Sequence, residues 1–277
     1  MKLYKIKNDI IIESGGQFYL LRNEDWDRFV NDDNLFNKMM RISKSQNPVE
    51  NYTNLLNNID APIQSQELWA SGVTYLKSKR GRQQESEKAG GGNFYAHVYA
   101  AERPELFFKA TRNRIANPGC KVRIRKDSTW NVPEPELTLM ITSSGKIVGY
   151  TIGNDMSSRS IEGENPLYLP QAKTYDGCAA VGPCIYITER SLPEDTVIYM
   201  EVTRKGEMVF QGQVQINRIK RNLKDLVSFL YLECTFPHGS LLMTGTGIVP
   251  TNDFTLQSGD KIVIIIQPIG TLINEVE

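Results

Sequence analysis

A chain of 277 residues, 40% of them hydrophobic and 23% charged, has the composition of an ordinary globular protein with one large domain or a large and a small one. Its 32 basic and 32 acidic side chains cancel, which argues against a nucleic-acid-binding protein with a broad cationic face. No apolar run approaches the roughly 20 residues that cross a bilayer, and the start of the chain shows no secretory signal, so we expect a cytoplasmic protein without a membrane span.

The first 64 residues are predicted to form a small N-terminal domain. Strand-like runs at residues 3–6 and 10–12 are followed by Gly15-Gly16, a hairpin signal, and then by a third apolar run at residues 18–21. Polar, Asn-rich sequence continues to about residue 58, and Asp60-Ala61-Pro62 is typical of a boundary. We therefore divide the chain into an N-terminal domain at residues 1–64 and a catalytic domain at residues 65–277.

The next segment, residues 73–88, is rich in Lys, Arg, Glu and Gln and has few large apolar side chains. This composition favours a helix that lies mainly at the surface, and a glycine run at residues 90–92 follows it. A polar helix tethered by glycines is either a solvated excursion or a lid that closes on substrate, and the sequence favours the solvated alternative. Residues 94–101 return to the spacing of an amphipathic helix.

Beyond Pro104 the chain is rich in strand-like runs, and a hairpin turn is predicted at Arg204-Lys205-Gly206-Glu207. One helix is clearly indicated at residues 222–233, where five apolar side chains form a stripe at helical spacing. Many strands, few helices and no regular βαβ alternation predict an α+β fold dominated by sheet.

The four cysteines are scattered along the chain, without a pair at zinc-finger or redox spacing. We expect reduced thiols that are mostly buried. A nucleophilic cysteine needs a histidine partner, and the sequence places neither His97 nor His238, the two histidines of the chain, beside a cysteine. Thiol catalysis is therefore disfavoured.

Three carboxylates mark the ends of two strand-like runs. Glu134 and Glu136 open the run at residues 137–141, and side chains two apart on a strand point the same way, so both carboxylates face one side. Like charges held this close require a compensating cation. Asp155 ends the strand-like run that begins at residue 147. Such a carboxylate set suits Mg²⁺, Mn²⁺ or Ca²⁺ better than zinc, although exposed strand glutamates and a turn-capping aspartate are the simpler alternative.

Four ordered motifs resemble those of the fumarylacetoacetate hydrolase family. They are Glu-x-Glu at Glu134, the segment at residues 149–159, Lys173 ahead of Tyr175-Asp176-Gly177, and Thr244-Gly245-Thr246-Gly247, with residues 103–109 similar to the family's entry into its catalytic domain. The resemblance covers about residues 68–269. It implies a mixed β-roll with a divalent metal, usually magnesium, at one end, and assembly as a homodimer or homotetramer. Within the family, residues 161–173 are most similar to the branch that dehydrates 2-keto-3-deoxy-D-arabinonate.

The resemblance also implies roles for individual residues. Glu134, Glu136 and Asp155 are the expected metal ligands, Lys173 and Thr246 are expected to hold the keto-acid substrate, and Arg159 is expected to line the site. The hydrolases of the family place a His–Glu pair over the metal, with the histidine often supplied by the segment that corresponds to residues 73–88. This segment has no histidine here, which favours elimination of water over hydrolysis of a C–C bond.

Elimination from a 2-keto-3-deoxy sugar acid requires a base near C3 and an acid near the C4 oxygen, and it yields 2,5-dioxopentanoate. Lys173 is the candidate base, because a partly desolvated lysine near a divalent cation has a depressed pKa. The alternative is that Lys173 only pairs with a carboxylate or binds that of the substrate. Glu85 and Glu105 are the candidate acids, Glu85 only if its segment closes as a lid, and His238 is a minor alternative.

Two rival functions stay open at this point. One is a hydrolase of the same family that cleaves an acylpyruvate or a fumarylacetoacetate-like diketone. The other is a non-catalytic module that binds a metal and a keto acid on the same scaffold. Both rivals share the predicted metal ligands with the dehydratase, so only turnover of defined substrates separates the three.

Overall fold

The computed structural model describes residues 1–50, 52–86 and 92–277, without the side chains of residues 84–86 and 92–94. The strands are β1 (Lys2–Ile6), β2 (Asp9–Ser14), β3 (Gln17–Leu21), β4 (Glu67–Gly72), β5 (Glu105–Ala110), β6 (Ile115–Ala116), β7 (Lys121–Val122), β8 (Asn131–Val132), β9 (Pro135–Ile141), β10 (Ile147–Asp155), β11 (Ser157–Ser158), β12 (Ala179–Tyr186), β13 (Val197–Arg204), β14 (Glu207–Gln215), β15 (Ser240–Met243), β16 (Lys261–Ile266) and β17 (Gly270–Val276). The α-helices are α1 (Trp26–Val30), α2 (Leu35–Ser45), α3 (Tyr52–Leu56), α4 (Leu76–Ser86), α5 (Gly92–Ala100), α6 (Arg159–Glu164), α7 (Leu169–Lys173) and α8 (Leu223–Tyr231), and short 3₁₀ turns are η2 (Arg112–Arg114), η3 (Pro166–Tyr168) and η4 (Ile216–Arg218).

The largest sheet has the strand order β3-β2-β1-β12-β10-β9-β15-β4-β5, with β6 paired to β12. β1 pairs antiparallel with β12, so the N-terminal strands extend the same sheet that carries the predicted site. The Gly15-Gly16 hairpin between β2 and β3 is confirmed, and both glycines have positive φ, a conformation that glycine adopts without steric cost. The division of the chain after residue 64 stays a prediction.

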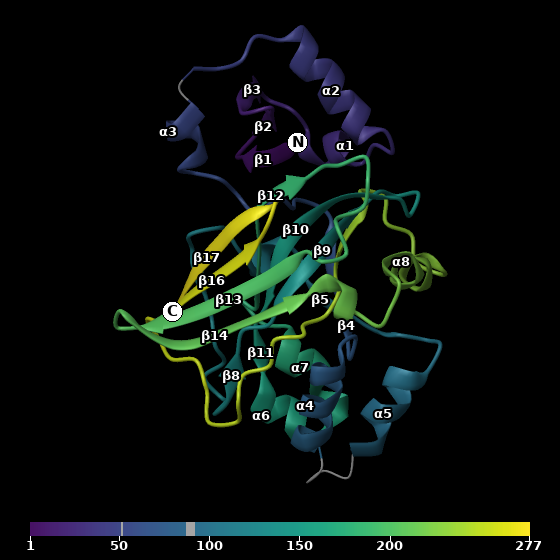
Figure 1. The fold of residues 1–277 in the computed structure, drawn as a ribbon, viewed down its shortest axis with the longest axis vertical. Coiled ribbons are helices and arrows are strands. Elements are labelled where there is room, and N and C mark those ends of the chain that lie inside the picture. Colours follow the sequence, from purple (N-terminus) through teal and green to yellow (C-terminus); the bar gives the residue numbers. More distant parts are fainter. Residues whose placement is uncertain (51, 87–91) are drawn as a thin grey trace.

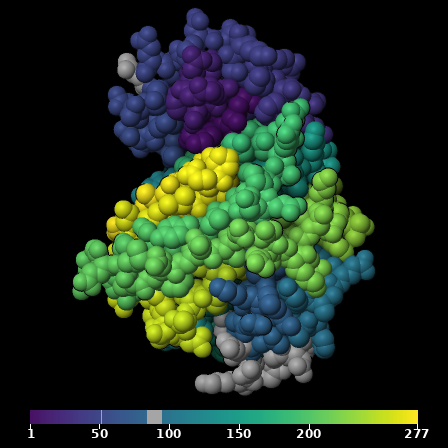
Figure 2. All heavy atoms as spheres, viewed as in Figure 1, coloured from purple at the N-terminus to yellow at the C-terminus, as the bar shows by residue number. Residues whose placement is uncertain are grey.

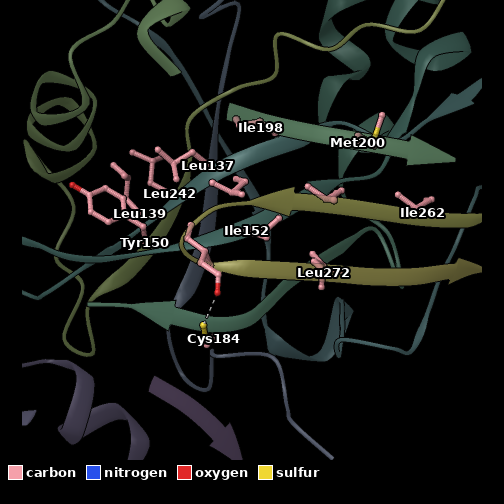
Figure 3. Packing of buried hydrophobic residues seen from close by; sticks show 14 of the residues in the cluster. Leu137, Leu139, Tyr150, Ile152, Cys184, Ile198, Met200, Leu242, Ile262 and Leu272 are labelled. Atoms are coloured by element: carbon pink, nitrogen blue, oxygen red, sulfur yellow. Dashed lines mark hydrogen bonds between the residues drawn. The ribbon is translucent and has the colours of Figure 1, made fainter. Parts of the chain in front are cut away.

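A second sheet, in the order β14-β13-β16-β17-β7, packs against one face of the first. Figure 3 shows Leu137 and Ile152 of the large sheet facing Ile198, Ile262 and Leu272 of the smaller one. These five side chains are at most 1% exposed. The predicted sheet-dominated α+β architecture is therefore confirmed, with one core between the two sheets.

Strand β9 has the alternating polar and apolar pattern that predicts a half-buried strand, but this prediction is wrong, because every residue of β9 is buried. Leu137, Leu139 and Ile141 belong to the core between the sheets. Met140 belongs to a second apolar cluster on the opposite face of the sheet, which includes Trp26 of α1. The N-terminal helices thus cover the face that the sequence pattern assigned to solvent.

Other local predictions hold. Helix α8 begins directly after Asn222, whose side chain accepts a hydrogen bond from the backbone N–H of Lys224 and so caps the helix. The hairpin between β13 and β14 turns at Lys205 and Gly206, both at positive φ. All four cysteines are free, although two of them, Cys120 and Cys234, are exposed. Among the described residues, no helix combines the length and the apolarity needed to span a membrane.

The predicted surface helix at residues 73–88 differs from expectation in its environment. Figure 1 shows α4 together with α6 and α7 at one end of the sheets, while α1–α3 lie at the opposite end. In the space-filling view, α4 (blue) lies against the green strands of the second sheet (Figure 2). The Arg82 side chain is only 7% exposed, because it forms an ion pair with the buried Glu162 of α6. The composition of α4 is that of a solvated helix, but the Arg82 side chain of this helix is buried.

Candidate active site

The structure brings the three predicted metal-binding carboxylates together. Glu134 precedes β9, Glu136 lies in it, and Asp155 ends the neighbouring antiparallel strand β10. The backbone groups of Glu134 and Asp155 form two mutual hydrogen bonds of 3.2 and 2.9 Å. Each carboxylate offers an oxygen within 4.8 Å of the other two, and all three residues are buried. The strand pairing therefore fixes the cluster independently of any bound ion.

Lys173 lies at the centre of this cluster. Its Nζ donates hydrogen bonds to Glu134 Oε2 at 2.8 Å, to Asp155 Oδ2 at 3.0 Å and to Ser157 Oγ at 2.5 Å. Burial alone would lower the pKa of Lys173, but Asp155, Glu134 and Glu162 outweigh burial and raise that pKa. The carboxylates around Lys173 therefore stabilise its ammonium, and a depressed pKa beside a bound cation stays a prediction.

Glu134 is held by cations from two elements. Arg159 Nη2 of α6 lies 2.9 Å from Glu134 Oε1, and the Lys173 ammonium binds the other carboxylate oxygen. Burial acts to raise the pKa of Glu134, but Lys173, Arg159 and Arg82 together hold that pKa below its ordinary value. Arg159 was predicted to line the site, and it does line the cavity there.

Glu136 has a different environment. Its Oε2 accepts a hydrogen bond of 2.5 Å from the backbone N–H of Gly245, and no cation among the described side chains forms an ion pair with it. Burial, reinforced by the charges of Asp155 and Glu134, raises the pKa of Glu136 well above its ordinary value. A divalent cation would supply the missing positive charge, and three carboxylates form the hard oxygen set that magnesium prefers. The residues therefore fit the predicted metal.

Lys109 is a member of the site that sequence reasoning missed. Its Nζ lies 2.6 Å from Asp155 Oδ1 and donates to the backbone carbonyls of Met156 and Lys173. The side chain is fully buried. The available signal was a lysine inside the apolar strand β5, since a lysine buried in this way requires an anionic partner.

Glu162 was also given no role from the sequence. Its side chain is fully buried, and three cations surround it: Arg82 Nη2 at 2.8 Å, Lys173 Nζ at 3.4 Å and Arg159 Nε at 3.8 Å. These cations come from α4, α7 and the start of α6. Glu162 therefore joins α4 to the carboxylate cluster through buried charge pairs.

A cavity of about 20 Å³ opens beside the carboxylates, which is room for an ion or one water. Its wall comes from β4, α4, β5 and the loop after β15, and it is lined by Ser71, Gly72, Val73, Ser78, Arg82, Phe107, Glu134, Glu136, Asp155, Arg159, Lys173, Gly245 and Thr246. A five-carbon acid needs more space, so side chains at this wall must move when such a ligand binds.

The predicted substrate contact Thr246 lines this cavity. Its hydroxyl donates to the carbonyl of Ile248 at 3.3 Å and accepts from the N–H of the same residue at 3.2 Å. The hydroxyl thus shapes the loop after β15, and its role in substrate binding stays a prediction.

Of the two candidate acids, Glu105 and Glu85, the structure describes the side chain of Glu105 only. Glu105 starts β5, and its buried Oε2 has no hydrogen-bond partner among the described residues. Burial raises the pKa of Glu105, and the opposing charge of Arg82 reduces this effect. A Cβ built on Gly72 would lie 2.0 Å from Glu105 Oε2, so this carboxyl lies directly behind the cavity wall. The side chain of Glu85 lies outside the described residues, and His238 is exposed.

Residues 69–277 match the family described as fumarylacetoacetate (FAA) hydrolase, C-terminal. The chain belongs to the fumarylacetoacetate hydrolase family. This match confirms the family predicted from the sequence motifs, and it includes every predicted site residue from Glu85 to Thr246.

Two family members with dehydratase names are similar to most of the chain. A probable 2-keto-3-deoxyxylonate dehydratase of Haloferax volcanii is 46% identical over 216 residues, which cover 78% of this chain and 73% of the relative. The 2-dehydro-3-deoxy-D-arabinonate dehydratase of Saccharolobus solfataricus is 42% identical over 221 residues, covering 79% and 74%.

Among solved structures, 2-keto-3-deoxy-D-arabinonate dehydratase complexed with magnesium and 2,5-dioxopentanoate superposes with a TM-score of 0.85. It is 36% identical in sequence, and the match covers 100% of this chain and 99% of that chain. A hexagonal crystal form of 2-keto-3-deoxyarabinonate dehydratase gives a TM-score of 0.87 with the same coverage. The predicted fold of the family type is thus confirmed over the full length of the chain.

Proposed function

We propose that the protein is a magnesium-dependent dehydratase that converts 2-keto-3-deoxy-D-arabinonate to 2,5-dioxopentanoate and water. The observation that carries this function is the buried carboxylate cluster around Lys173, in a chain 42% identical to a dehydratase of that sugar acid. A further dehydratase relative and a structure with magnesium and 2,5-dioxopentanoate support the same reaction and metal.

The three carboxylates define where the reacting end of the substrate lies. Glu134, Glu136 and Asp155 would hold the magnesium ion, which would supply Lewis acidity to a bound 2-keto acid and so make its C3 hydrogen more acidic. Lys173 is placed to act on that hydrogen, because its Nζ lies within 3.0 Å of two of the three carboxylates. A bound divalent cation would offset the carboxylate charges that raise the pKa of Lys173, so that a neutral amine could accept the C3 proton. As an ammonium, Lys173 would instead orient the substrate carboxylate.

The acid is assigned to Glu105. A carboxyl whose pKa is raised by burial keeps its proton nearer to neutral pH and can deliver it to the departing C4 hydroxyl, which leaves as water. The C4–O bond breaks as the C3–H electrons form the C3–C4 double bond. Loss of a proton from C5 and protonation at C3 then give the C4=C5 enol. This enol yields the aldehyde of 2,5-dioxopentanoate when its hydroxyl proton is lost and C4 is protonated, so the net change is the loss of one water.

The hydrolase alternative is less well supported. Hydrolysis requires a group that activates water, and in the family this group is a histidine above the metal. None of the side chains that line the described cavity is a histidine, and both His97 and His238 are exposed. The α4 residues that line the cavity are Ser78 and Arg82, among the side chains that the structure describes.

Turnover of defined substrates tests the function. Purified protein with Mg²⁺ is given 2-keto-3-deoxy-D-arabinonate or an acylpyruvate, and products are followed by mass spectrometry, with EDTA-treated protein as the control. The dehydratase produces 2,5-dioxopentanoate without chain cleavage and loses this activity in EDTA. Release of pyruvate from the acylpyruvate would instead establish the hydrolase, and ligand binding without turnover in either reaction would establish the non-catalytic module.

A homodimer or homotetramer is part of the same proposal. The hairpin of β13 and β14 projects from the body of the molecule and exposes Met208 and Val209, at 53% and 40% (Figure 2). Exposed apolar side chains on a projecting hairpin are suited to contact with a second copy. Light scattering of the purified protein measures the number of subunits directly, and a monomer at all concentrations would contradict assembly.

A further inference from the structure

Glu162 lies outside the cavity wall, yet it contacts three residues that line the cavity, Arg82, Lys173 and Arg159. Its Oε1 is 2.8 Å from Arg82 Nη2 and 3.4 Å from Lys173 Nζ. Arg82 and Lys173 both line the cavity, from α4 and α7. One buried carboxylate oxygen is therefore shared between the proposed base and the helix that covers the site.

Because Glu162 and its partners are buried, the loss of the Glu162 charge would affect each cation that contacts it. The side chains of Glu162, Lys173 and Arg82 are 0, 1 and 7% exposed. Water cannot replace a lost partner at such a position, so removal of the Glu162 charge leaves Arg82, Lys173 and Arg159 without one of their counter-charges. Arg82 would lose the pair that holds α4 against α6, and Lys173 would keep only its bonds to Glu134, Asp155 and Ser157.

We propose that Glu162 is a positioning residue that orients the Lys173 amine and seats Arg82 over the cavity at the same time. The orientation of Lys173 and the position of α4 beside the cavity then both depend on one carboxylate, which does not contact the substrate. This assignment rests on the proposed dehydratase function for its kinetic consequence, whereas its structural consequence, the seating of α4, can be measured without turnover.

The kinetic test compares Glu162→Gln with wild type at saturating Mg²⁺. The amide keeps the shape of the side chain and removes its charge, and we expect kcat to fall by about 10- to 100-fold, as for other groups that orient a catalytic residue. Asp260→Asn is the matched control, because Asp260 is an equally buried carboxylate that is paired with Arg204 and does not line the cavity. Its kcat should equal that of wild type.

A double-mutant cycle with Arg82→Gln tests whether the two residues act through their pair. Arg82→Gln is expected to raise KM, and addition of Glu162→Gln should raise KM by less than about threefold more, because the pair is already broken. If the double variant raised KM by the product of the two single-variant factors, the two residues would act independently, and the proposed role of their ion pair would be rejected. So would a kcat of Glu162→Gln equal to that of wild type, or a loss that disappears as Mg²⁺ is raised.

Limited proteolysis tests the seating of α4 without reference to any reaction. Trypsin cleaves after Lys77 and Arg80 of α4 only when the helix opens, and cleavage reports the population of that open state. We expect Glu162→Gln to be cleaved there at least about tenfold faster than wild type, and Asp260→Asn to be cleaved at the wild-type rate in α4. Equal rates for all three proteins would overturn the seating role. If wild-type protein had no dehydratase activity but Glu162→Gln were still cleaved faster than wild type, the proposed function would be refuted and the role of Glu162 in holding α4 would stand.

Discussion

Lys109 Nζ lies 2.6 Å from Asp155 Oδ1, while Lys173 Nζ binds the other oxygen of the same carboxylate at 3.0 Å. Asp155 is thus held between two buried ammonium groups. Lys109 also donates to the backbone carbonyl of Lys173, so the two lysines are fixed relative to each other. The position of the carboxylate cluster follows from this charge arrangement as well as from the strand pairing.

Replacement of Lys109 by methionine should destabilise the metal-free protein strongly. The variant removes one partner of a fully buried pair, which costs about 3–5 kcal/mol and lowers Tm by roughly 10 °C in a chain of this size. Mg²⁺ should recover more of the Tm in the variant than in wild type, since the ion restores positive charge beside Asp155. Thermal melts with EDTA and with Mg²⁺ measure both effects.

Lys121→Met is the matched control for this variant. Lys121 also pairs with a glutamate, but both side chains are more than half exposed, so the loss should stay below about 1 kcal/mol. If Lys109→Met and Lys121→Met had the same Tm in EDTA, the Lys109–Asp155 ion pair would contribute little to the stability of the fold.

Glu134→Gln and Glu136→Gln should differ in their effect on the Tm measured in EDTA. The charge of Glu134 is paired with Lys173 and Arg159, so its loss destabilises the fold. The carboxyl of Glu136 is held with a raised pKa by burial and by neighbouring carboxylates, so an amide of the same shape should leave Tm in EDTA unchanged or higher.

With Mg²⁺ present, both variants should fail to gain the Tm increase that wild type shows, because each has lost a ligand of the proposed metal site. Titration calorimetry with Mn²⁺ measures the same loss directly. An undiminished Mn²⁺ affinity in either variant would remove that residue from the ligand set.

The sequence predicted the features that depend on neighbours along the chain. Alternation along a strand placed Glu134 and Glu136 on one side, and the run that became β10 ended at Asp155 as predicted. The family motifs added Lys173, which the structure places among these carboxylates. Each of these inferences needed only a local pattern or an ordered set of motifs.

The features that the sequence did not predict depend on contacts between distant segments. Arg82 and Glu162 are 80 positions apart, and a helix with the composition of α4 is solvated unless a buried carboxylate meets it. The raised pKa of Lys173 likewise follows from how many carboxylates surround one amine. Neither the Arg82–Glu162 contact nor the pKa of Lys173 can be read from residue spacing along the chain.

Glu105 should make the stability and the activity of the protein depend on pH. Burial raises the pKa of its carboxyl above the ordinary value of 4.5. Between that value and the raised one, the folded protein holds a proton that the unfolded chain has released, so this group's contribution to stability is lost as pH rises.

Glu105→Gln should therefore flatten the decrease of stability with rising pH in that window, as measured by urea unfolding in EDTA. If Glu105 is also the acid, kcat of wild type decreases as pH rises through the same pKa, and the variant loses about 10²-fold or more of kcat. A wild-type protein and a Glu105→Gln variant with parallel stability profiles would contradict the raised pKa.

Gly72→Ala should displace the Glu105 carboxyl without unfolding the protein. A Cβ at this position would lie 2.0 Å from Glu105 Oε2, which is the free end of a flexible side chain and can move away at little cost. Misplacement of a catalytic group by about 1 Å costs on the order of 10²-fold in rate, so kcat should fall strongly while Tm changes little. In a Glu105→Gln background the same substitution should have no further effect on kcat, because the group that it displaces is already gone.

Gly149→Ala provides the matched control, since a Cβ there would crowd Ile185 and Ile187 at 2.5 and 2.6 Å in the part of β10 remote from Asp155. This variant should lose stability through overpacking, by about 1–3 kcal/mol, and retain its kcat. Melting curves and steady-state kinetics of both variants separate the two outcomes. If Gly72→Ala retained wild-type kcat while a crystal structure showed the Glu105 carboxyl displaced, Glu105 would have no part in the reaction. The acid would then have to be sought among the residues that line the cavity.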